Sequence, residues 1–417
     1  MPFDLILRQA ALAGRADPVD IGIRAGTIAE IAPRMAAVAR EIALDGRLVT
    51  PGFVDSHIHL DKACLTGRCV CRTGTLGEAI AAVAAAKRDF TEEDIYQRGA
   101  RTLEKAILQG TNRMRTHVEV DPRVGLKGFR AVSALKRDYR WAVDLQICVF
   151  PQEGLLNDPG AEDLLVEACA GGADLIGGCP YADTDPAGQI ARIFDIARRF
   201  DLNVDFHLDF DLDPSWMHLD EVCRQTARHG WGGRVAAGHV TKLSELAPDD
   251  LAVVATRLAD AGVALTALPA TDLFLMGAGR THSVPRGVAP LHRAAEAGVT
   301  CSLATNNVLN PFTPFGDCSL LRMANLYANV LQIGTPEGLA ACFDMVTAGP
   351  ARLMRLDGYG IAVGVPAHLV VLDAHNPAEA VATLAQPLFG LRHGVMTFSR
   401  PAPALLRPVP ARAARAG

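Results

Sequence analysis

The segment Pro-Gly-Phe-Val-Asp-Ser-His-Ile-His-Leu-Asp, residues 51–61, marks the point at which the sequence pattern changes. Its β-branched and aromatic residues predict a short buried strand over Val54–His59. Residues 1–50 contain short strand-like runs joined by turns, whereas after Pro51 such runs alternate with helical stretches of about ten to twenty residues. That alternation is typical of parallel strands with crossover helices.

Eight strand-like runs can be counted between residues 54 and 306. A helical stretch follows each of them, and a doubly wound sheet usually has only five or six strands. The count therefore predicts a (β/α)8 barrel of the TIM type. The runs are Val54–His59, Asn112–Val120, Val143–Gln152, Asp174–Pro180, Asn203–Asp209, Arg234–Val240, Gly262–Leu268 and Thr300–Asn306.

Both ends of the chain contain short strand-like runs separated by turns. We expect residues 1–50 and 351–400 to form one small β-sandwich domain, and residues 51–350 to form the barrel. Residues 401–417 contain several prolines and arginines without periodicity, which predicts a flexible tail.

Composition excludes several broad classes of protein. With 417 residues, 49% apolar and 21% charged, the chain is long and apolar enough for a substantial core. Its net charge of −5 and the lack of a basic patch argue against a nucleic-acid partner. Ten scattered cysteines without a CxxC pair indicate reduced, buried thiols. No stretch reads as a signal peptide or membrane span, so we expect a cytoplasmic protein with no membrane partner.

Histidines gather at the predicted carboxyl ends of the strands, where barrels of this kind build their sites. His57 and His59 alternate on one strand, so their imidazoles share a face. His207 ends the fifth strand, while His117 and His239 end the second and sixth. Neutral imidazoles suit a borderline-soft divalent cation such as zinc or ferrous iron. We therefore predict a metal site at His57, His59 and His207.

Other polar residues at strand ends have two interpretations each. His239 orients a bound water or is a buried core histidine, and we favour the first. Gln152 can recognise the edge of an amide or heterocycle, or it caps a loop. His117 and Glu119 brace the metal ligands, or they only form internal hydrogen bonds.

Residues 51–61 resemble the first-strand signature of the amidohydrolase superfamily, and the similarity is greatest to its cytosine deaminase branch. The resemblance extends over nearly the whole chain, through Arg115–Val118, Phe150–Gly154, His207, Gly238-His239 and Asn306-Asn307. It implies a barrel with one metal on His57, His59 and His207, whose water attacks a carbon of a nitrogen heterocycle. It also implies that His239 orients this water and that Gln152 holds the ring. The fourth strand, with Ile176–Cys179, offers no lysine that could bridge a second metal.

Two positions depart from this branch. Phe210 stands where a glutamate normally shuttles protons, and Asn306 stands where an aspartate normally binds the metal and accepts a proton from water. Asn306 can still coordinate through its oxygen, but an amide is a poor base. Asp209 and Asp211 are candidate catalytic substitutes, because on an extended strand they would share the face of His207.

Phe210 and Asn307 are expected to contact the substrate, and Phe210 makes one pocket wall apolar. We therefore expect a hydrolase that uses one divalent metal, zinc or iron, to cleave a C–N bond of a small cyclic or amide-like nitrogen compound other than cytosine. Two alternatives stay open. The chain could be a non-catalytic binding pseudoenzyme, or a biosynthetic enzyme whose metal acts as a Lewis acid for ring closure or dehydration. The resemblance is compatible with a homo-oligomer.

Overall fold

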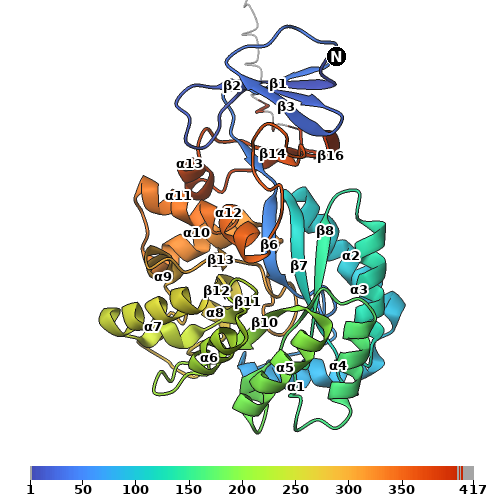
Figure 1. Cartoon of the computed structure of the whole chain (residues 1–417), viewed down its shortest axis with the longest axis vertical. Coiled ribbons are helices and arrows are strands. Elements are labelled where there is room, and N and C mark those ends of the chain that lie inside the picture. Colours follow the sequence, from blue (N-terminus) through green and yellow to red (C-terminus); the bar gives the residue numbers. More distant parts are fainter. Residues whose placement is uncertain (1, 402, 404, 407–417) are drawn as a thin grey trace, which may run out of the picture.

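The computed structural model describes residues 2–401, 403, 405 and 406, so most of the tail predicted for 401–417 lies outside the described residues. Figure 1 shows a strand-rich part at one end of the molecule and a barrel surrounded by helices at the other. The domain boundaries given above stay a prediction, and the sheets described below show which strands each part contains.

Eight parallel strands form the central sheet and follow one another in chain order around it. Ile58 and Asn306 form a parallel bridge between its two ends, and the Asn306 amide donates to the His57 carbonyl at 2.8 Å. The sheet is thereby closed, which confirms the predicted (β/α)8 fold. Its strands are β6 (Phe53–Ile58), β7 (Thr111–Glu119), β8 (Asp144–Phe150), β9 (Leu175–Ile176), β10 (Asn203–Leu208), β11 (Val235–His239), β12 (Val263–Ala267) and β13 (Cys301–Leu303).

The strand β9 is much shorter than the predicted run of residues 174–180. A Cβ at Gly177 would lie 2.1 Å from the Asp205 carbonyl oxygen, so the backbone of β10 approaches here as closely as only glycine permits. Pro180 then begins a 3-10 helix, η2 (Pro180–Ala182), and has no amide hydrogen for a strand ladder. The strand therefore ends soon after it begins.

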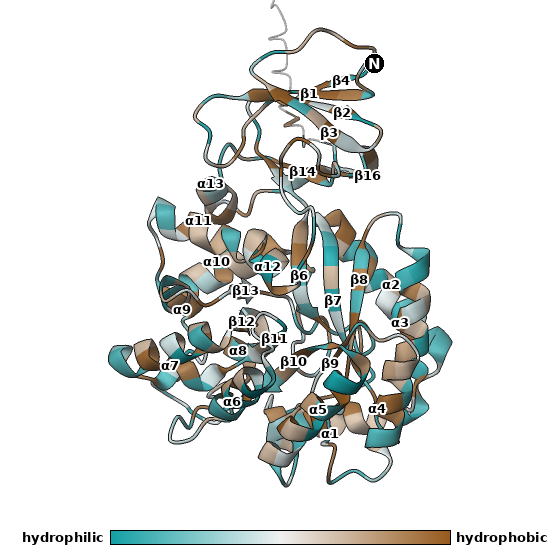
Figure 2. Cartoon of the chain, viewed as in Figure 1, coloured by the Kyte–Doolittle hydropathy of each residue, from teal (hydrophilic) through white to brown (hydrophobic). Residues whose placement is uncertain are grey.

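Helices surround the barrel with their apolar residues turned inward. In α2, Thr91 accepts a hydrogen bond from the Asp94 amide at 3.1 Å, and Ile95, Leu103 and Ile107 are buried. Figure 2 shows hydrophilic and hydrophobic residues together on these helices, as expected for a layer between core and solvent. They are α2 (Glu92–Leu108), α3 (Lys127–Asp138), α4 (Ala161–Ala170), α5 (Pro186–Phe200), α6 (Leu219–His229), α7 (Pro248–Ala261), α8 (Pro269–Leu275), α9 (Leu291–Glu296), α10 (Leu320–Leu331), α11 (Pro336–Asp344) and α12 (Ala348–Leu353).

Both chain ends build the small β part, as predicted. One sheet has the order β3-β2-β1-β4 and the other β16-β15-β14-β5, and buried residues of both, such as Leu7 and Leu369, share one core. This is a β-sandwich, and β5 leads directly into the first barrel strand. The elements are β1 (Leu5–Ala10), β2 (Val19–Arg24), β3 (Thr27–Ala32), β4 (Glu41–Ala43), β5 (Val49–Pro51), β14 (Leu369–Leu372), α13 (Pro377–Ala382), β15 (Pro387–Arg392) and β16 (Val395–Ser399).

The connection between β6 and α2 covers the carboxyl end of the barrel. It contains α1 (Leu76–Ala86) and the 3-10 helix η1 (Lys87–Asp89). Ala79 and Val83 of α1 belong to an apolar cluster with Phe210 and Phe312, which follow β10 and β13. In Figure 1, α1 lies at the opposite end of the barrel from the β-sandwich. We call residues 62–90 the cover segment.

Among the described residues, none of the helices combines the length and the apolar character that crossing a bilayer requires.

Candidate metal centre and active site

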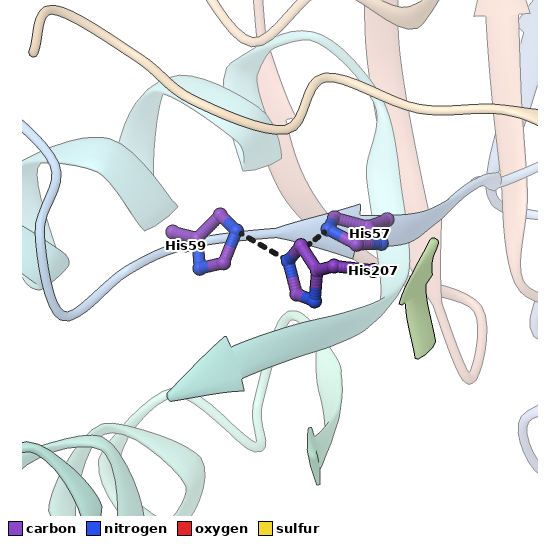
Figure 3. A group of neighbouring side chains, drawn as sticks. All are labelled: His57, His59 and His207. Atoms are coloured by element: carbon purple, nitrogen blue, oxygen red, sulfur yellow. Dashed lines mark hydrogen bonds between the residues drawn. The ribbon is translucent and has the colours of Figure 1, made fainter. Parts of the chain in front are cut away.

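Three imidazoles meet inside the carboxyl end of the barrel. His57 Nε2 lies 3.1 Å from His207 Nε2, which in turn lies 3.2 Å from His59 Nε2 (Figure 3). All three side chains are buried. Gly238 leaves room for this arrangement, because a Cβ there would lie 3.0 Å from His57 Nδ1. The prediction that the first and fifth strands bring these side chains together agrees with this geometry.

The protonation of these rings fits metal ligation. His59 Nδ1 lies 3.1 Å from the His117 carbonyl and donates to it, which leaves the lone pair on Nε2. Burial, together with the neighbouring imidazoles, lowers the pKa of His57 and of His207 well below the usual range, and burial with Lys62 does the same for His59. All three are therefore neutral at pH 7, as a metal requires.

The spacing of the three Nε2 atoms fits as well. Two ligands held at about 2.0–2.1 Å from a tetrahedral ion lie about 3.4 Å apart, close to the separations found here. Neutral lone pairs gain nothing from facing one another without a shared proton or ion. These three nitrogens are therefore suited to holding a single divalent cation.

Left-handed backbone conformations turn the strand ends toward this centre. His239 has φ 71° and the β-branched Val240 has φ 43°, while Asp209 and Asn306 have φ 48° and 57°. His, Asp and Asn adopt this region more readily than other residues with a side chain, whereas a β-branched valine there is strained. Such conformations occur here at the ends of β10 and β11 and just after β13, where each strand breaks off and its next side chain changes direction.

His239 is held by an aspartate. Its Nδ1 lies 2.6 Å from Asp272 Oδ1, and the other carboxylate oxygen accepts from the Leu268 amide at 3.0 Å. The His239 ring centre is 5.7 Å from that of His207. Because Nδ1 donates to the carboxylate, Nε2 is the nitrogen that can exchange a proton.

Phe210 contributes an apolar surface to the same place. Its ring stacks on His239 with centroids 3.7 Å apart and an interplanar angle of 26°. Leu65 and Phe312 belong to the same apolar cluster. An apolar substituent on a substrate would find favourable contacts at this wall.

A second buried cluster lies beside the imidazoles. Lys62 Nζ contacts Glu119 Oε1 at 2.6 Å and Gln152 Oε1 at 3.1 Å. Lys87 Nζ contacts the other Glu119 oxygen at 2.9 Å, Asp121 at 2.5 Å and Glu153 at 2.6 Å. We call Lys62, Lys87, Glu119, Asp121 and Glu153 the ion-pair cluster. Its three acids are spaced closely enough to hold a metal, but Lys87 already fills that position.

Asn306 has a buried and unpaired amide. Its backbone bonds to both His57 and His59, and neither its Oδ1 nor its Nδ2 has a hydrogen-bond partner among the described residues. Buried polar atoms are rarely left in this state, so they indicate a ligand or water that belongs there. The adjacent Asn307 accepts from Asn310 Nδ2 at 2.7 Å.

Most of the chain matches one known protein family. The model of the family described as "Amidohydrolase family" matches residues 40–135 and 145–388. The chain belongs to the amidohydrolase superfamily. Its similarities place it in the cytosine deaminase-like branch, which confirms the resemblance predicted from the sequence.

Three relatives illustrate this membership. N-isopropylammelide isopropyl amidohydrolase of Pseudomonas sp. (strain ADP) is 28% identical over 402 residues, which cover 94% of this chain and 96% of that protein. Pterin deaminase of Rhizobium rhizogenes is 29% identical over 382 residues, 90% of this chain and 86% of that one. The structure of 5-methylcytosine deaminase from Klebsiella pneumoniae with 5-fluorocytosine matches with a TM-score of 0.93 at 30% identity, covering 97% of this chain and 99% of that chain.

In this amidohydrolase the two proposed acid substitutes lie elsewhere than the sequence reasoning assumed. Both oxygens of Asp209 accept from backbone amides at the start of α6, those of His218 at 2.9 Å and Leu219 at 3.0 Å. Asp211 is 44% exposed and pairs with Lys242 at 3.2 Å. The assumption of an extended strand fails because β10 ends at Leu208.

The other predicted residues lie at the barrel mouth. Gln152 is buried, and its Nε2 donates to Cys179 Sγ at 3.4 Å. The His117 ring stacks on His57 with centroids 3.7 Å apart, while its carbonyl holds His59. Glu119 belongs to the ion-pair cluster and contacts lysines instead of the imidazoles.

Sequence reasoning missed Asp272, Lys62 and Lys87. Asp272 could have been found from the sequence, because it lies a few residues after the seventh strand. The loops that follow barrel strands carry site residues, just as the strand ends do. Lys62 stands three residues after His59 in the same loop. For Lys87 the sequence carries no signal, since it comes from a helical stretch that only tertiary folding brings to β7.

Proposed function

We propose that this protein is a metal-dependent hydrolase that cleaves a C–N bond of a nitrogen heterocycle other than cytosine, and that it releases ammonia or an amine. The observation that carries the proposal is the convergence of three neutral Nε2 atoms beside a His239–Asp272 pair. Amidohydrolase superfamily members use a divalent metal. Zinc or iron on His57, His59 and His207, with the Asn306 oxygen as a fourth donor, would complete the centre.

A bound divalent metal supplies a water of lowered pKa and polarises the atom under attack. The side chains supply the proton transfers. His239 Nε2 accepts a proton from the water while the water oxygen forms its bond to the ring carbon. The same nitrogen then returns the proton to the leaving nitrogen as the C–N bond breaks. Asp272 keeps Nδ1 protonated throughout, so the reactive nitrogen always faces the substrate.

Gln152 and the apolar wall would bind the substrate. Lys62 occupies the Gln152 oxygen, which orients the Gln152 side chain. Phe210 stands over His239 and favours an apolar substituent near the reacting atom. The names of the relatives, an isopropyl amidohydrolase and a pterin deaminase, support amino- or alkylamino-substituted rings as the substrate class. Asn307 remains our candidate for a further substrate contact.

Metal analysis followed by a substrate panel tests this proposal. The protein, reconstituted separately with zinc and ferrous iron, should hold about one ion per chain, and His207→Ala should hold far less. Aminopyrimidines, pterins and N-alkylaminotriazines would then be assayed for released ammonia or alkylamine, with His207→Ala as control. Metal below about a tenth of an equivalent, or amine release that His207→Ala leaves unchanged, would overturn the proposal.

Two observations favour the pseudoenzyme alternative. Phe210 cannot transfer a proton, and the Asn306 amide is a poor base. Heterocycle binding by calorimetry without release of amine would support this alternative. Substrate loss without amine release would instead support Lewis-acid chemistry such as ring closure.

A further inference from the structure

We propose that this centre, once it holds a divalent metal, binds its ligand as an anion, so that the substrate reaches the metal through a negatively charged oxygen or nitrogen. The inference rests on the proposed function, because it needs the metal on His57, His59 and His207. It adds to that function the charge state of the substrate.

The donor set carries no negative charge. Among the described residues, the group of ligating atoms built from the three converging imidazoles consists of His57, His59 and His207 and includes no carboxylate. A second group joins His57 to His117 and Asp205, but the Asp205 carboxylate is paired with Arg115. Asn306, whose backbone bonds to His57 and His59, offers only a neutral amide. A divalent cation held by these side chains would keep its full charge of two in a buried place, where uncompensated charge is costly.

The buried acids nearby are already bonded to other groups. Asp272 is held by His239 and the Leu268 amide, and Asp55 by the hydroxyl and amide of Thr305 at 2.5 and 3.2 Å.

Two more acids are paired with cations. Glu119 lies between Lys62 and Lys87, and Asp205 contacts Arg115 at 2.7 Å. Asp205 Oδ1 has no hydrogen-bond partner among the described residues, but the charge of its carboxylate is paired with Arg115. The negative donor on the metal is then either a hydroxide formed from its own water or an anionic substrate that takes the place of that water.

Buried N–H groups without acceptors also favour an anionic ligand. If the Nε2 atoms ligate a metal, the protons of His57 and His207 lie on Nδ1, and neither Nδ1 has a partner among the described residues. The Asn306 Nδ2 is buried and likewise unpartnered within the described chain. Buried donors without acceptors favour a ligand or water rich in acceptors. A heterocycle with an ionised ring imide and one with a carboxylate substituent share this chemistry.

Anion binding to the cobalt-substituted protein tests the proposal. Cobalt content is measured first, and then acetate and its neutral analogue acetamide are titrated while the visible cobalt absorption is followed. We expect acetate to bind at least about tenfold more tightly than acetamide. A barbiturate titration separates the two sources: tighter binding than acetate indicates a ring anion, and weaker binding indicates a carboxylate.

Variants at Asn306 provide the matched comparison. Asn306→Asp adds one negative charge and should weaken acetate binding at least about tenfold, whereas the neutral Asn306→Ala should change it less than about threefold. Equal affinities for acetate and acetamide in the wild type would overturn the inference, even if the Asp variant fails to fold. Failure of the wild type to bind cobalt would instead overturn the proposed metal centre itself.

Discussion

The barrel mouth contains two buried clusters of titratable side chains. Both take polar groups out of water, but they compensate the loss of hydration in opposite ways. In the ion-pair cluster, every charge faces an opposite charge: Lys87 touches Glu119, Asp121 and Glu153. In the histidine cluster of His57, His59, His207 and His239, three Nε2 atoms instead face one another. The first cluster is complete by itself, whereas the second is complete only with a ligand.

The pKa of Glu119 shows the same difference, whereas burial and the neighbouring Glu119 carboxylate raise the pKa of Glu153, at the edge of the cluster, to about 7. Burial alone would raise the pKa of Glu119, but Lys62 and Lys87 outweigh it and lower that pKa to about 2. Burial lowers the pKa of the histidines, and no carboxylate offsets this for His57, His59 or His207. Charged residues that carry their own counter-ions stabilise the site's walls, whereas neutral residues with free lone pairs are available for chemistry.

The largest effect is expected for Asp272→Asn. An amide cannot hold His239 in the tautomer that leaves Nε2 free, so kcat should fall about 10²–10⁴-fold while metal content stays unchanged. Steady-state kinetics on the substrate identified from the panel would measure this. Asp209→Asn, which alters a buried carboxylate that accepts two backbone amides, is the matched control and should retain kcat. Equal losses in the two variants would contradict a special role for Asp272.

Lys87→Met should cost about 3–5 kcal/mol of unfolding free energy. The change removes the cation shared by the buried Glu119 and Asp121 and the half-buried Glu153, and breaking a buried ion pair from one side is strongly destabilising. Urea unfolding would measure the loss. Lys136→Met removes a partly exposed pair with Asp174 and should cost about 0–1 kcal/mol. If both variants lose the same amount, the ion-pair cluster does not stabilise the fold as we infer.

Removal of the metal should destabilise only a protein with an intact histidine cluster. With metal at about 100–1,000 times its Kd, binding contributes about 2.7–4.1 kcal/mol to the folded state. Chelation should therefore lower the unfolding free energy of the wild type by that amount and leave His207→Ala unaffected. A chelator that shifts both proteins equally would show that it acts outside this centre.

Asp209→Ala should have the smallest effect. The carboxylate accepts two amides at the start of α6, and loss of such a cap costs about 0.5–2 kcal/mol of stability. Turnover per folded molecule, measured on the substrate identified from the panel, should be nearly unchanged. If turnover instead drops by about two orders of magnitude or more, as expected for loss of a general acid or base, the catalytic role that the sequence first suggested for Asp209 is restored.

Much of the site was predictable because a parallel barrel brings strand ends together. The alternation of His57 and His59, with His207 on the fifth strand, was sufficient to predict the three imidazoles. The prediction for Asp209 relied on the period of two along a strand, and it failed where Asp209 adopts φ 48° and the strand ends. Periodicity predicts directions only as far as the regular element continues.

The sequence by itself determined the barrel, the sandwich built from both chain ends and the histidines of the proposed centre, because these depend on local patterns repeated along the chain. Tertiary structure decided which carboxylate forms a hydrogen bond or ion pair with which basic residue. Asp272 reaches His239, and Lys87 enters a group of three carboxylates, across separations of 33 and up to 66 residues. The sequence lists these charged residues without their partners, and only folding determines which of them neutralise one another and which lone pairs are left for a ligand.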